Sequence, residues 1–285
     1  MGQHVLTTHS RIKIGNDRTR QEETMKYGFI GCGNMGSAIA TALSKTTKSI
    51  VLSDRSGKAI SLAEKLGIQY DTPQHVAEIS DRLFLAVKPQ VLPDILAELA
   101  PTLRQKKPVL ISMAAGIEIG KIVESVGAPL PVIRIMPNTP VLVGNGTTLF
   151  CYNSAITQEI ITDFLSDMKS CGLMDNISEK LMDAASAVAG CGPAYAYIFV
   201  EAMADAAVAC GIPRDKAIAY AANMLIGAGQ MVIQTQQHPG ALKDAVSSPG
   251  GSTIAGIKVL EDAGFRGIVM DCIVSAYHRT QELGK

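Results

Sequence analysis

The sequence has little charge and few aromatic residues. Of its 285 residues, 18% are charged, 5% are aromatic and none is tryptophan, and its 26 basic residues are balanced by 26 acidic ones. A protein that binds the phosphate backbone of nucleic acids usually has a basic excess, so no nucleic-acid partner is expected. Because 47% of the residues are apolar and so few are charged, the chain is expected to cover apolar surface by forming oligomers.

Long apolar runs are also lacking. The longest stretch without Asp, Glu, Lys or Arg, residues 217–242, contains Asn223 and several glutamines, and the stretch 184–200 is interrupted by Gly190, Gly192 and Pro193. Neither is the predominantly apolar run of about 20 residues that a bilayer requires. No apolar signal-peptide core is recognisable either, so no membrane partner is expected.

The six cysteines are scattered and form no C-x-x-C pair and no Cys/His pair at zinc spacing. Neither a structural metal site nor a disulfide framework is therefore expected. Reduced, buried thiols are the default for such a chain, and they favour a cytoplasmic location.

The pattern of predicted elements divides the chain into two parts. From Met25 onward, short apolar runs alternate with helical patterns, which indicates β-α-β units around a parallel sheet. The predicted strands are 26–30, 49–53, 82–87, 108–112 and 131–136, and the clearest helices of this part are 34–44 and 155–169. After Asn176 strand patterns stop, and helices are predicted near 193–210, 213–235, 255–262 and 266–282. We expect a flexible extension over 1–24, an α/β domain over 25–176 and an all-α domain over 177–285.

A G-x-G-x-x-G motif follows the first predicted strand and opens a helix, which is the context in which this motif binds a dinucleotide. Gly31 permits the tight turn, Gly33 lets the backbone approach a pyrophosphate, and Gly36 allows the helix to pack closely on the strand. Backbone amides at the start of the helix then contact the phosphates. The motif predicts that residues 25–176 form a Rossmann-type dinucleotide-binding domain. Its cofactor residues are Gly31, Cys32, Gly33, Asn34, Met35 and Gly36.

The end of the second strand bears on the choice between NAD and NADP. An acidic residue there binds the ribose 2′-hydroxyl, whereas an arginine with hydroxyl groups accepts a 2′-phosphate. This sequence offers both, because Ser53 is followed by Asp54, Arg55 and Ser56. Arg55 and Ser53 favour NADP(H), with NAD(H) as the alternative if Arg55 is only a solvated surface charge.

Two later strands end in similar positions, and ligands of open α/β sheets bind outside the carboxyl ends of the strands. Lys88 could reach a phosphate or a ribose there, or be an ordinary surface lysine. The small residues after the fourth strand would let a nicotinamide ribose lie against the backbone. The further cofactor residues predicted in this way are Ala86, Val87, Lys88, Pro89, Ala114, Ala115 and Gly116.

A second concentrated signal, Ser-Pro-Gly-Gly-Ser-Thr over residues 248–253, interrupts the predicted helices. Ser252 and Thr253 are suited to cap the helix that follows. Consecutive glycine and serine amides at a helix start form a cradle for an anion, and a carboxylate would suit it. A plain turn between helices needs one glycine rather than this sequence, so we predict a binding loop.

Several stretches resemble the pyrroline-5-carboxylate reductase family, and the resemblance covers residues 25–285. They include GFIGCGNMG from Gly28, AVKPQ from Ala86, RIMPNTP from Arg134 and GCGPAY from Gly190. The stretch HPGALKDAVSSPGGSTIAGIKVLEDAGFRG from His238 is the most specific to the family. The resemblance implies a Rossmann-type domain followed by an all-α dimerisation domain. It also implies reduction of 1-pyrroline-5-carboxylate to L-proline, the last step of proline biosynthesis, by hydride transfer from NAD(P)H to the cyclic imine carbon.

The resemblance further implies that substrate lies between the nicotinamide and the 248–253 loop of a partner subunit, and that dimers assemble into a decamer. Thr253 is the candidate catalytic residue, because its hydroxyl could bind the ring nitrogen or relay a proton through water. A helix cap is the alternative role for Thr253. The substrate residues carried over from the family are Val246, Ser248, Gly250, Gly251, Ser252 and Thr253.

Two positions depart from the family. Some members have a Glu just before His-Pro-Gly, where this chain has Gln236 and Gln237, so a charge role is not carried over. Pro73 stands where some members have an Asn near the adenosine. His238 itself is expected to fix a turn rather than to act in catalysis.

Two other functions fit the same domain order. A β-hydroxyacid dehydrogenase would need a catalytic lysine on the helix after the interdomain connection, where this chain has residues 190–195. A non-enzymatic dinucleotide sensor would leave the loop 248–253 unexplained.

The shortage of charged residues is most marked in one region of the chain. Between Gly190 and Thr235 the only formal charges are Glu201, Asp205, Arg214, Asp215 and Lys216. Helices so bare of charge are expected to be buried on more than one face, which predicts an intersubunit interface.

Overall fold

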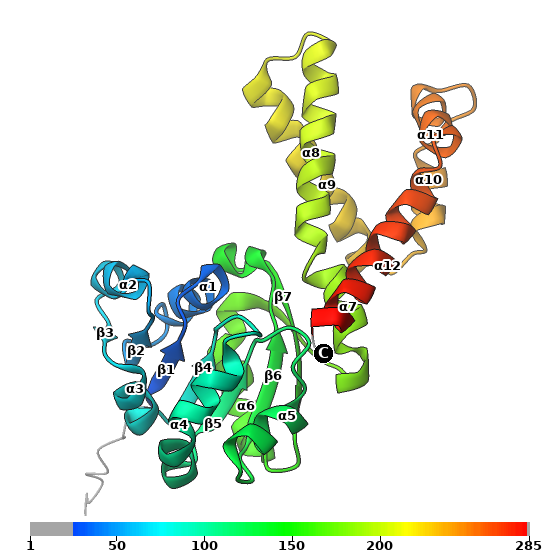
Figure 1. The fold of residues 1–285 in the computed structure, drawn as a ribbon. Coiled ribbons are helices and arrows are strands. Elements are labelled where there is room, and N and C mark those ends of the chain that lie inside the picture. The colour runs from blue at the N-terminus through cyan, green and yellow to red at the C-terminus, as the bar shows by residue number, and fades with distance from the viewer. Residues whose placement is uncertain (1–24, 284–285) are drawn as a thin grey trace, which may run out of the picture.

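A computed structural model describes residues 25–283, so the predicted flexible extension over 1–24 lies outside the described residues. Across these residues, eight strands form one sheet in the order β3-β2-β1-β4-β5-β6-β7-β8 (Figure 1). The strands are β1 (Tyr27–Ile30), β2 (Ile50–Ser53), β3 (Gln69–Tyr70), β4 (Arg82–Leu85), β5 (Val109–Ser112), β6 (Val132–Met136), β7 (Gly146–Tyr152) and β8 (Gly172–Asn176).

The order in which strands are added to the sheet reverses at β1. Tyr27 of β1 lies opposite Ile50 of β2 on one side and Arg82 of β4 on the other, and both pairings are parallel. The chain therefore moves outward to β2 and β3 and then returns to β4 on the opposite side of β1. In open α/β sheets such a switch point leaves a crevice at the carboxyl ends of the two central strands. Only the pairing of β6 with β7 is antiparallel among the described strands.

Helices cover both faces of the sheet, as a parallel sheet requires. Alternate strand residues point to opposite faces, so Phe29 and Phe84 stack in one core while Leu83 and Leu85 lie in the other. The first core is covered by α1 (Asn34–Leu43), α2 (Lys58–Leu66) and α6 (Gln158–Met168), and the second by α3 (Pro73–Ile79), α4 (Leu92–Lys106) and α5 (Ile119–Val126). Short 3-10 turns η1 (Thr139–Val143), η2 (Lys169–Cys171) and η3 (Glu179–Leu181) complete this part.

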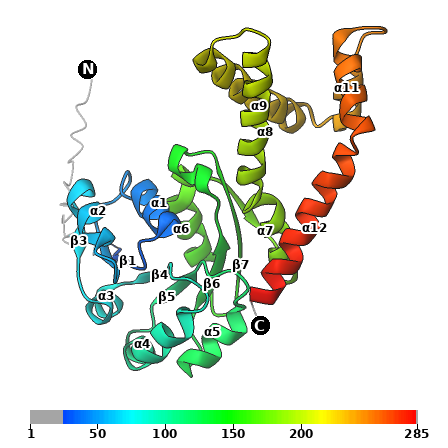
Figure 2. The same ribbon diagram turned by 45° about the horizontal axis from the view of Figure 1, so that its top comes forward.

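The rest of the chain is helical and projects from the sheet (Figures 1 and 2). Its helices are α7 (Met182–Ala189), α8 (Gly192–Ala209), α9 (Arg214–Thr235), α10 (Pro239–Ala245), α11 (Ser252–Asp262) and α12 (Phe265–Leu283). Helix α8 packs along α9, and α12 returns to pack against α7 near the sheet. Burial is sparse: Ala204 is the buried residue of α8, Thr280 that of α12, and α11 has none.

Buried polar contacts fix α7 to the sheet. Arg134 of β6 pairs with Glu179 at 3.3 Å and with Asp183 at 2.9 Å. Asn138 donates from its side-chain amide to the Ala189 carbonyl at 2.9 Å and accepts from the backbone amide of residue 147 at 2.8 Å. Side chains from β6 and from the turn after it therefore hold both ends of α7, from which the helical part extends.

The predicted fold class is confirmed, with an α/β part that contains a mostly parallel sheet followed by helices alone. The elements without a predicted counterpart are the strands β3 and β8 and the helices α3, α4, α5, α7 and α10. The last strand ends at Asn176 and α7 begins at Met182. The domain limits at 176 and 177 stay a prediction.

Candidate active site

The glycine motif forms a tight loop between β1 and α1. Gly31 has a φ of +99°, and a Cβ atom there would lie 2.6 Å from the Ala86 carbonyl oxygen. A Cβ on Gly36 would lie 2.4 Å from the Gly31 carbonyl oxygen. Gly33 differs, because a Cβ there would meet no atom within 4 Å. The first and third glycines thus allow close packing of the loop, whereas the second leaves open space beside the backbone.

A pocket of about 260 Å³ lies beside this loop, at the carboxyl ends of β1, β2 and β4. The amides of Gly33, Asn34 and Met35, at the start of α1, have no acceptor among residues 25–283. Such amides suit a pyrophosphate, and the apolar side chains on the pocket wall suit an adenine ring. The lining residues are Ile30, Gly31, Gly33, Ser53, Asp54, Arg55, Ser56, Pro73, Ala86, Val87, Lys88, Val91 and Ile95.

Asp54 is turned toward the glycine loop. One carboxylate oxygen accepts from the Cys32 amide at 2.8 Å, and the other accepts from the Ser56 amide at 2.7 Å and from the Ser56 hydroxyl. Partial burial acts to raise the pKa of Asp54, but the hydrogen bonds from Cys32 and Ser56 outweigh it and lower this pKa below its usual value. The carboxylate is therefore ionised and already bonded within its own loop.

Arg55 reaches across the pocket. Its guanidinium lies 3.7 Å from Glu98 of α4, and both side chains remain substantially exposed. Glu98 in turn accepts a hydrogen bond from the side-chain amide of Gln74 on α3. Tyr70 donates weakly to the Asp54 carbonyl oxygen, at 3.5 Å. Sequence reasoning singled out Arg55 but missed Glu98, which no local motif marks.

Of the remaining predicted cofactor residues, Ala86, Val87 and Lys88 line this pocket. Cys32 is buried behind the loop, and burial first, then the charge of Asp54, raises its pKa to about 12. Ala114 and Gly116 follow β5, the strand next to β4, and both are buried. Cys32, Asn34, Met35, Gly36, Pro89, Ala114, Ala115 and Gly116 do not line the pocket itself.

The loop 248–253 joins α10 to α11. Gly250 has a φ of +67°, and Gly251 is the N-cap residue of α11 with no side-chain cap. The expectation that Ser252 and Thr253 cap this helix is therefore wrong, because both lie inside its first turn. Their amides, and the Thr253 hydroxyl, have no hydrogen-bond partner in the described part of the chain. The start of α11 therefore presents hydrogen-bond donors, the first-turn amides and the Thr253 hydroxyl, and no side chain caps the helix.

The other predicted substrate residues belong to the same segment. Val246 is the C-cap residue of α10 and is exposed, and Ser248 accepts from the Gly251 amide at 3.0 Å through its carbonyl oxygen. His238 caps α10, because its ring Nδ1 accepts from the Gly240 amide at 3.0 Å. This structural role agrees with the expectation that His238 fixes a turn.

A single chain does not bring the two halves of the predicted site together. The nucleotide pocket lies on the sheet, whereas α10, α11 and the loop between them lie at the outer end of the helical part (Figures 1 and 2). The first-turn donors of α11 therefore face no nucleotide pocket within their own chain.

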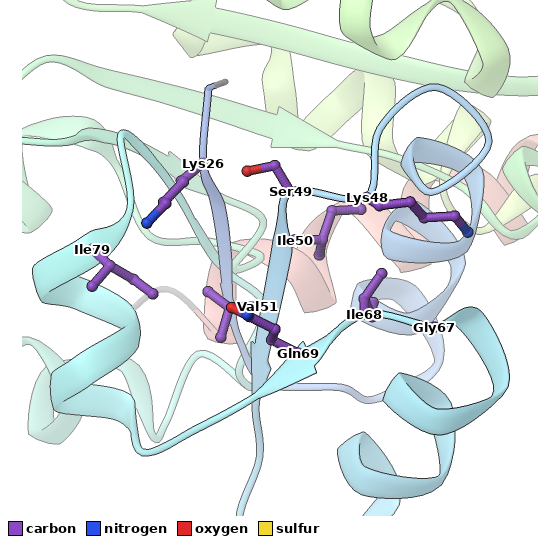
Figure 3. A pocket seen from close by; sticks show the side chains of 9 residues that line it. All are labelled: Lys26, Lys48, Ser49, Ile50, Val51, Gly67, Ile68, Gln69 and Ile79. Carbon is purple, nitrogen blue, oxygen red and sulfur yellow. The ribbon is translucent and has the colours of Figure 1, made fainter. Parts of the chain in front are cut away.

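A second pocket, of about 400 Å³, lies at the opposite end of the strands (Figure 3). Lys26 and Ile79 lie on one side of it and Ile68 on another, near the start of β1 and β2. None of the predicted site residues lines this pocket. It is therefore separate from the candidate active site.

Comparison with known proteins matches both parts of the chain. The family model described as pyrroline-5-carboxylate reductase dimerisation matches residues 179–283, and that described as NADP oxidoreductase coenzyme F420-dependent matches residues 26–116. The pyrroline-5-carboxylate reductase of Escherichia coli (strain K12) is 39% identical over 91% of this chain and 98% of its own. The chain belongs to the pyrroline-5-carboxylate reductase family.

Other members support the same assignment. The pyrroline-5-carboxylate reductase of Glycine max is 38% identical over 92% of this chain and 97% of its own. The crystal structure of the Plasmodium falciparum pyrroline carboxylate reductase with NADP bound has a TM-score of 0.85 and 33% identity, and covers 92% of this chain and 99% of its own. The predicted family, fold and oxidoreductase class are confirmed, and reduction of pyrroline-5-carboxylate is the activity for which these relatives are named. The β-hydroxyacid dehydrogenase alternative is set aside.

The match also explains the apolar helices. From the sequence, no run is expected to be apolar enough for a bilayer, but two helical stretches that overlap the two runs considered, Glu179–Ala209 and Arg214–Thr235, are long and apolar enough to cross a membrane by length and composition alone. Both lie within the region matched to the dimerisation family. Their exposed apolar surface is therefore the surface of a dimerisation domain, as the poverty in charge predicts.

Proposed function

We propose that this protein reduces 1-pyrroline-5-carboxylate to L-proline, with NADPH as its preferred cofactor, at a site that the 248–253 loop of a second copy completes. The uncapped start of α11 carries this proposal. Its first-turn donors have no acceptor among the described residues, and they lie within the region matched to the pyrroline-5-carboxylate reductase dimerisation family.

The loop after β1 would hold the cofactor. The amides of Gly33 to Met35 would bind the pyrophosphate, with Pro73, Val91 and Ile95 as the apolar wall for the adenine. Ala114, Ala115 and Gly116 would flank the nicotinamide ribose. When bound, NADPH supplies the hydride that reduces the imine carbon.

The preference for NADPH follows from the end of β2. The Asp54 carboxylate already accepts three hydrogen bonds from Cys32 and Ser56, which use most of its acceptor sites and make it less available to a ribose 2′-hydroxyl. Arg55 lines the same pocket with an exposed guanidinium that suits a 2′-phosphate. NADH remains a usable cofactor in this proposal, because no group is placed to exclude it.

The partner's loop would hold the substrate carboxylate. Backbone amides at the start of α11, together with the positive end of the helix dipole, suit an anion of this size. The Thr253 hydroxyl, which is not needed as a cap, would bind the ring nitrogen and orient the imine. Holding the carboxylate and ring in an attack geometry could supply several of the about 7–11 kcal/mol available to proximity.

The helical part would form the dimer that brings each loop to the other subunit's pocket. Exposed apolar residues occur along α8, α9 and α12, and they include Ile198, Ile233 and Met270. Assembly of dimers into a decamer and a cytoplasmic location belong to the same proposal. Free thiols at all six cysteines fit a reducing compartment.

The direct test is oxidation of NADPH with 1-pyrroline-5-carboxylate, with proline measured as the product. A 3-hydroxy acid with NADP⁺ serves as the comparison substrate. Absence of proline formation together with turnover of the hydroxy acid would overturn the proposal.

Thr253→Ala tests the catalytic assignment. Because a positioned proton-transfer group contributes about 100-fold or more, we expect kcat to fall by about 100-fold while the Kd for NADPH stays within about twofold. Thr253→Ser keeps the hydroxyl and should recover most of the loss. If Thr253→Ala instead weakens NADPH and leaves kcat unchanged, Thr253 belongs to the nucleotide site.

A further inference from the structure

Glu98 is a charged residue at the nucleotide pocket that the proposed function does not use. It lies on α4 three residues after Ile95, which lines the pocket, so both side chains lie on the same face of the helix. Its carboxylate is 3.7 Å from the guanidinium of Arg55, which also lines the pocket.

Glu98 is also held from a second side. The side-chain amide of Gln74 on α3 donates to one carboxylate oxygen, while the other oxygen is the one nearest Arg55. Gln74 directly follows Pro73, another lining residue. Residues of α3, of α4 and of the loop after β2 therefore place a negative charge beside the Arg55 guanidinium.

We propose that Glu98 is a specificity-determining residue that limits the preference for NADPH by competing with the 2′-phosphate for Arg55. This inference rests on the proposed function, because it assumes that the pocket binds NADPH and that Arg55 meets its phosphate. It adds that Glu98 weakens the contact between Arg55 and the 2′-phosphate, so that NADH can compete with NADPH for the pocket.

The charges define the direction of the effect. A 2′-phosphate carries nearly two negative charges at neutral pH. To bind Arg55, it must displace the Glu98 carboxylate or share one cation with it, and both outcomes disfavour the phosphate-bearing cofactor. NADH carries a neutral hydroxyl at this position and meets neither cost.

The exposure of the pair limits the size of the effect. The side chain of Arg55 is 72% exposed and that of Glu98 is 40% exposed, so water screens their attraction. Exposed ion pairs of this kind stabilise by at most about 1 kcal/mol, which corresponds to about fivefold in a dissociation constant.

The test is Glu98→Gln, which removes the charge and keeps the size of the side chain. Its Kd for NADPH and for adenosine 2′,5′-bisphosphate should be about three- to fivefold lower than in the wild type, as measured by calorimetry. Its Kd for NADH and for 5′-AMP should stay within about twofold. The gain should shrink in high salt, because salt screens exposed charges.

Two controls separate competition for Arg55 from a general change in charge. Glu124→Gln changes the net charge equally at the carboxyl end of α5, outside the pocket lining, and should leave all four ligands unaffected. In an Arg55→Ala background, Glu98→Gln should no longer tighten NADPH. A gain that persists there would overturn the competition for Arg55.

The outcomes also separate this inference from the proposed function. If the wild type neither binds NADPH nor forms proline, the proposed function fails. If the wild type does both and Glu98→Gln leaves NADPH unchanged or weakens it, only the inference about Glu98 fails. Weaker binding in that variant would make Glu98 a support for Arg55 rather than a competitor.

Discussion

The two parts of this chain bury their apolar side chains in different ways. In residues 25–176, both faces of the sheet are covered, and strand residues such as Phe29 and Leu83 are fully buried within one chain. In the helices after residue 190, large apolar side chains such as Ile198 and Ile233 are exposed instead. The first part has a complete core of its own, whereas the second needs another copy of the chain. In the proposed site, the nucleotide half is correspondingly formed within one chain, whereas the substrate half needs the partner's loop.

The largest expected effect comes from placing a charge on the helical surface. Ile198 is 66% exposed on α8, and Ile198→Glu would leave one unpaired carboxylate per subunit in a dimer interface. An uncompensated buried charge costs about 3–5 kcal/mol. We expect light scattering to show monomers, proline formation to fall by more than about 100-fold, and NADPH binding to stay within about threefold of the wild type.

The matched control lies on the other part of the chain. Ile60 on α2 is 44% exposed, and Ile60→Glu should leave assembly and activity unchanged, because no partner surface is expected there. An Ile198→Glu protein that remains dimeric and active would show that this face of α8 is not in the interface.

Two glycine variants distinguish packing from ligand binding within the nucleotide half. Gly31→Ala places a Cβ 2.6 Å from the Ala86 carbonyl oxygen at a positive φ, so it should lower the free energy of unfolding by about 3 kcal/mol. The Cβ of Gly33→Ala would have no atom of residues 25–283 within 4 Å, so the melting temperature should be unchanged. Its methyl group would occupy the space beside the pyrophosphate, and the Kd for NADPH should rise by at least about tenfold.

Calorimetry measures the Kd of each variant for NADPH, and thermal unfolding measures its stability. Equal loss of stability in the two variants would mean that Gly33 is also needed for packing. Unchanged NADPH binding in Gly33→Ala would move the pyrophosphate away from the start of α1.

The sequence predicts the fold well because its signals are local. A buried strand followed by Gly31, Gly33 and Gly36 specifies a strand, a turn and a helix in one short stretch, and the structure has all three. Some of the elements that were missed carry weak local signals. The edge strand β8 contains the polar residues Asp175 and Asn176 and is mostly exposed, so no apolar run marks it.

Features that depend on residues far apart in the sequence could not be predicted. Arg134 and Asp183 are separated by 49 positions, and only the fold brings them to 2.9 Å. Glu98 and Arg55 are likewise on different elements. The capping role expected for Ser252 and Thr253 failed for a local reason, because Gly251 occupies the N-cap position. The loop 248–253 contacts no nucleotide pocket within the described part of its own chain, so the partner proposed to complete the site cannot be read from local sequence.

The smallest expected effect concerns the cysteines. Their rates of chemical modification compare the two parts of the chain without any substitution. Cys32, Cys151 and Cys171 are buried in the first part, and Cys210 in the second is exposed. Burial raises the pKa of Cys32 to about 12 and that of Cys151 to about 11, so at pH 8 only about one Cys32 thiol in ten thousand is the reactive thiolate. Iodoacetamide at pH 8 should therefore modify Cys210, which is exposed in the single chain, faster than Cys32, which should stay unmodified until the domain opens. Mass spectrometry of the digested protein reads each site, and labelling in denaturant serves as the control in which all six thiols react. Equal labelling rates at Cys32 and Cys210 in the native protein would mean that the nucleotide half opens as readily as the helical half, which would remove the contrast between them.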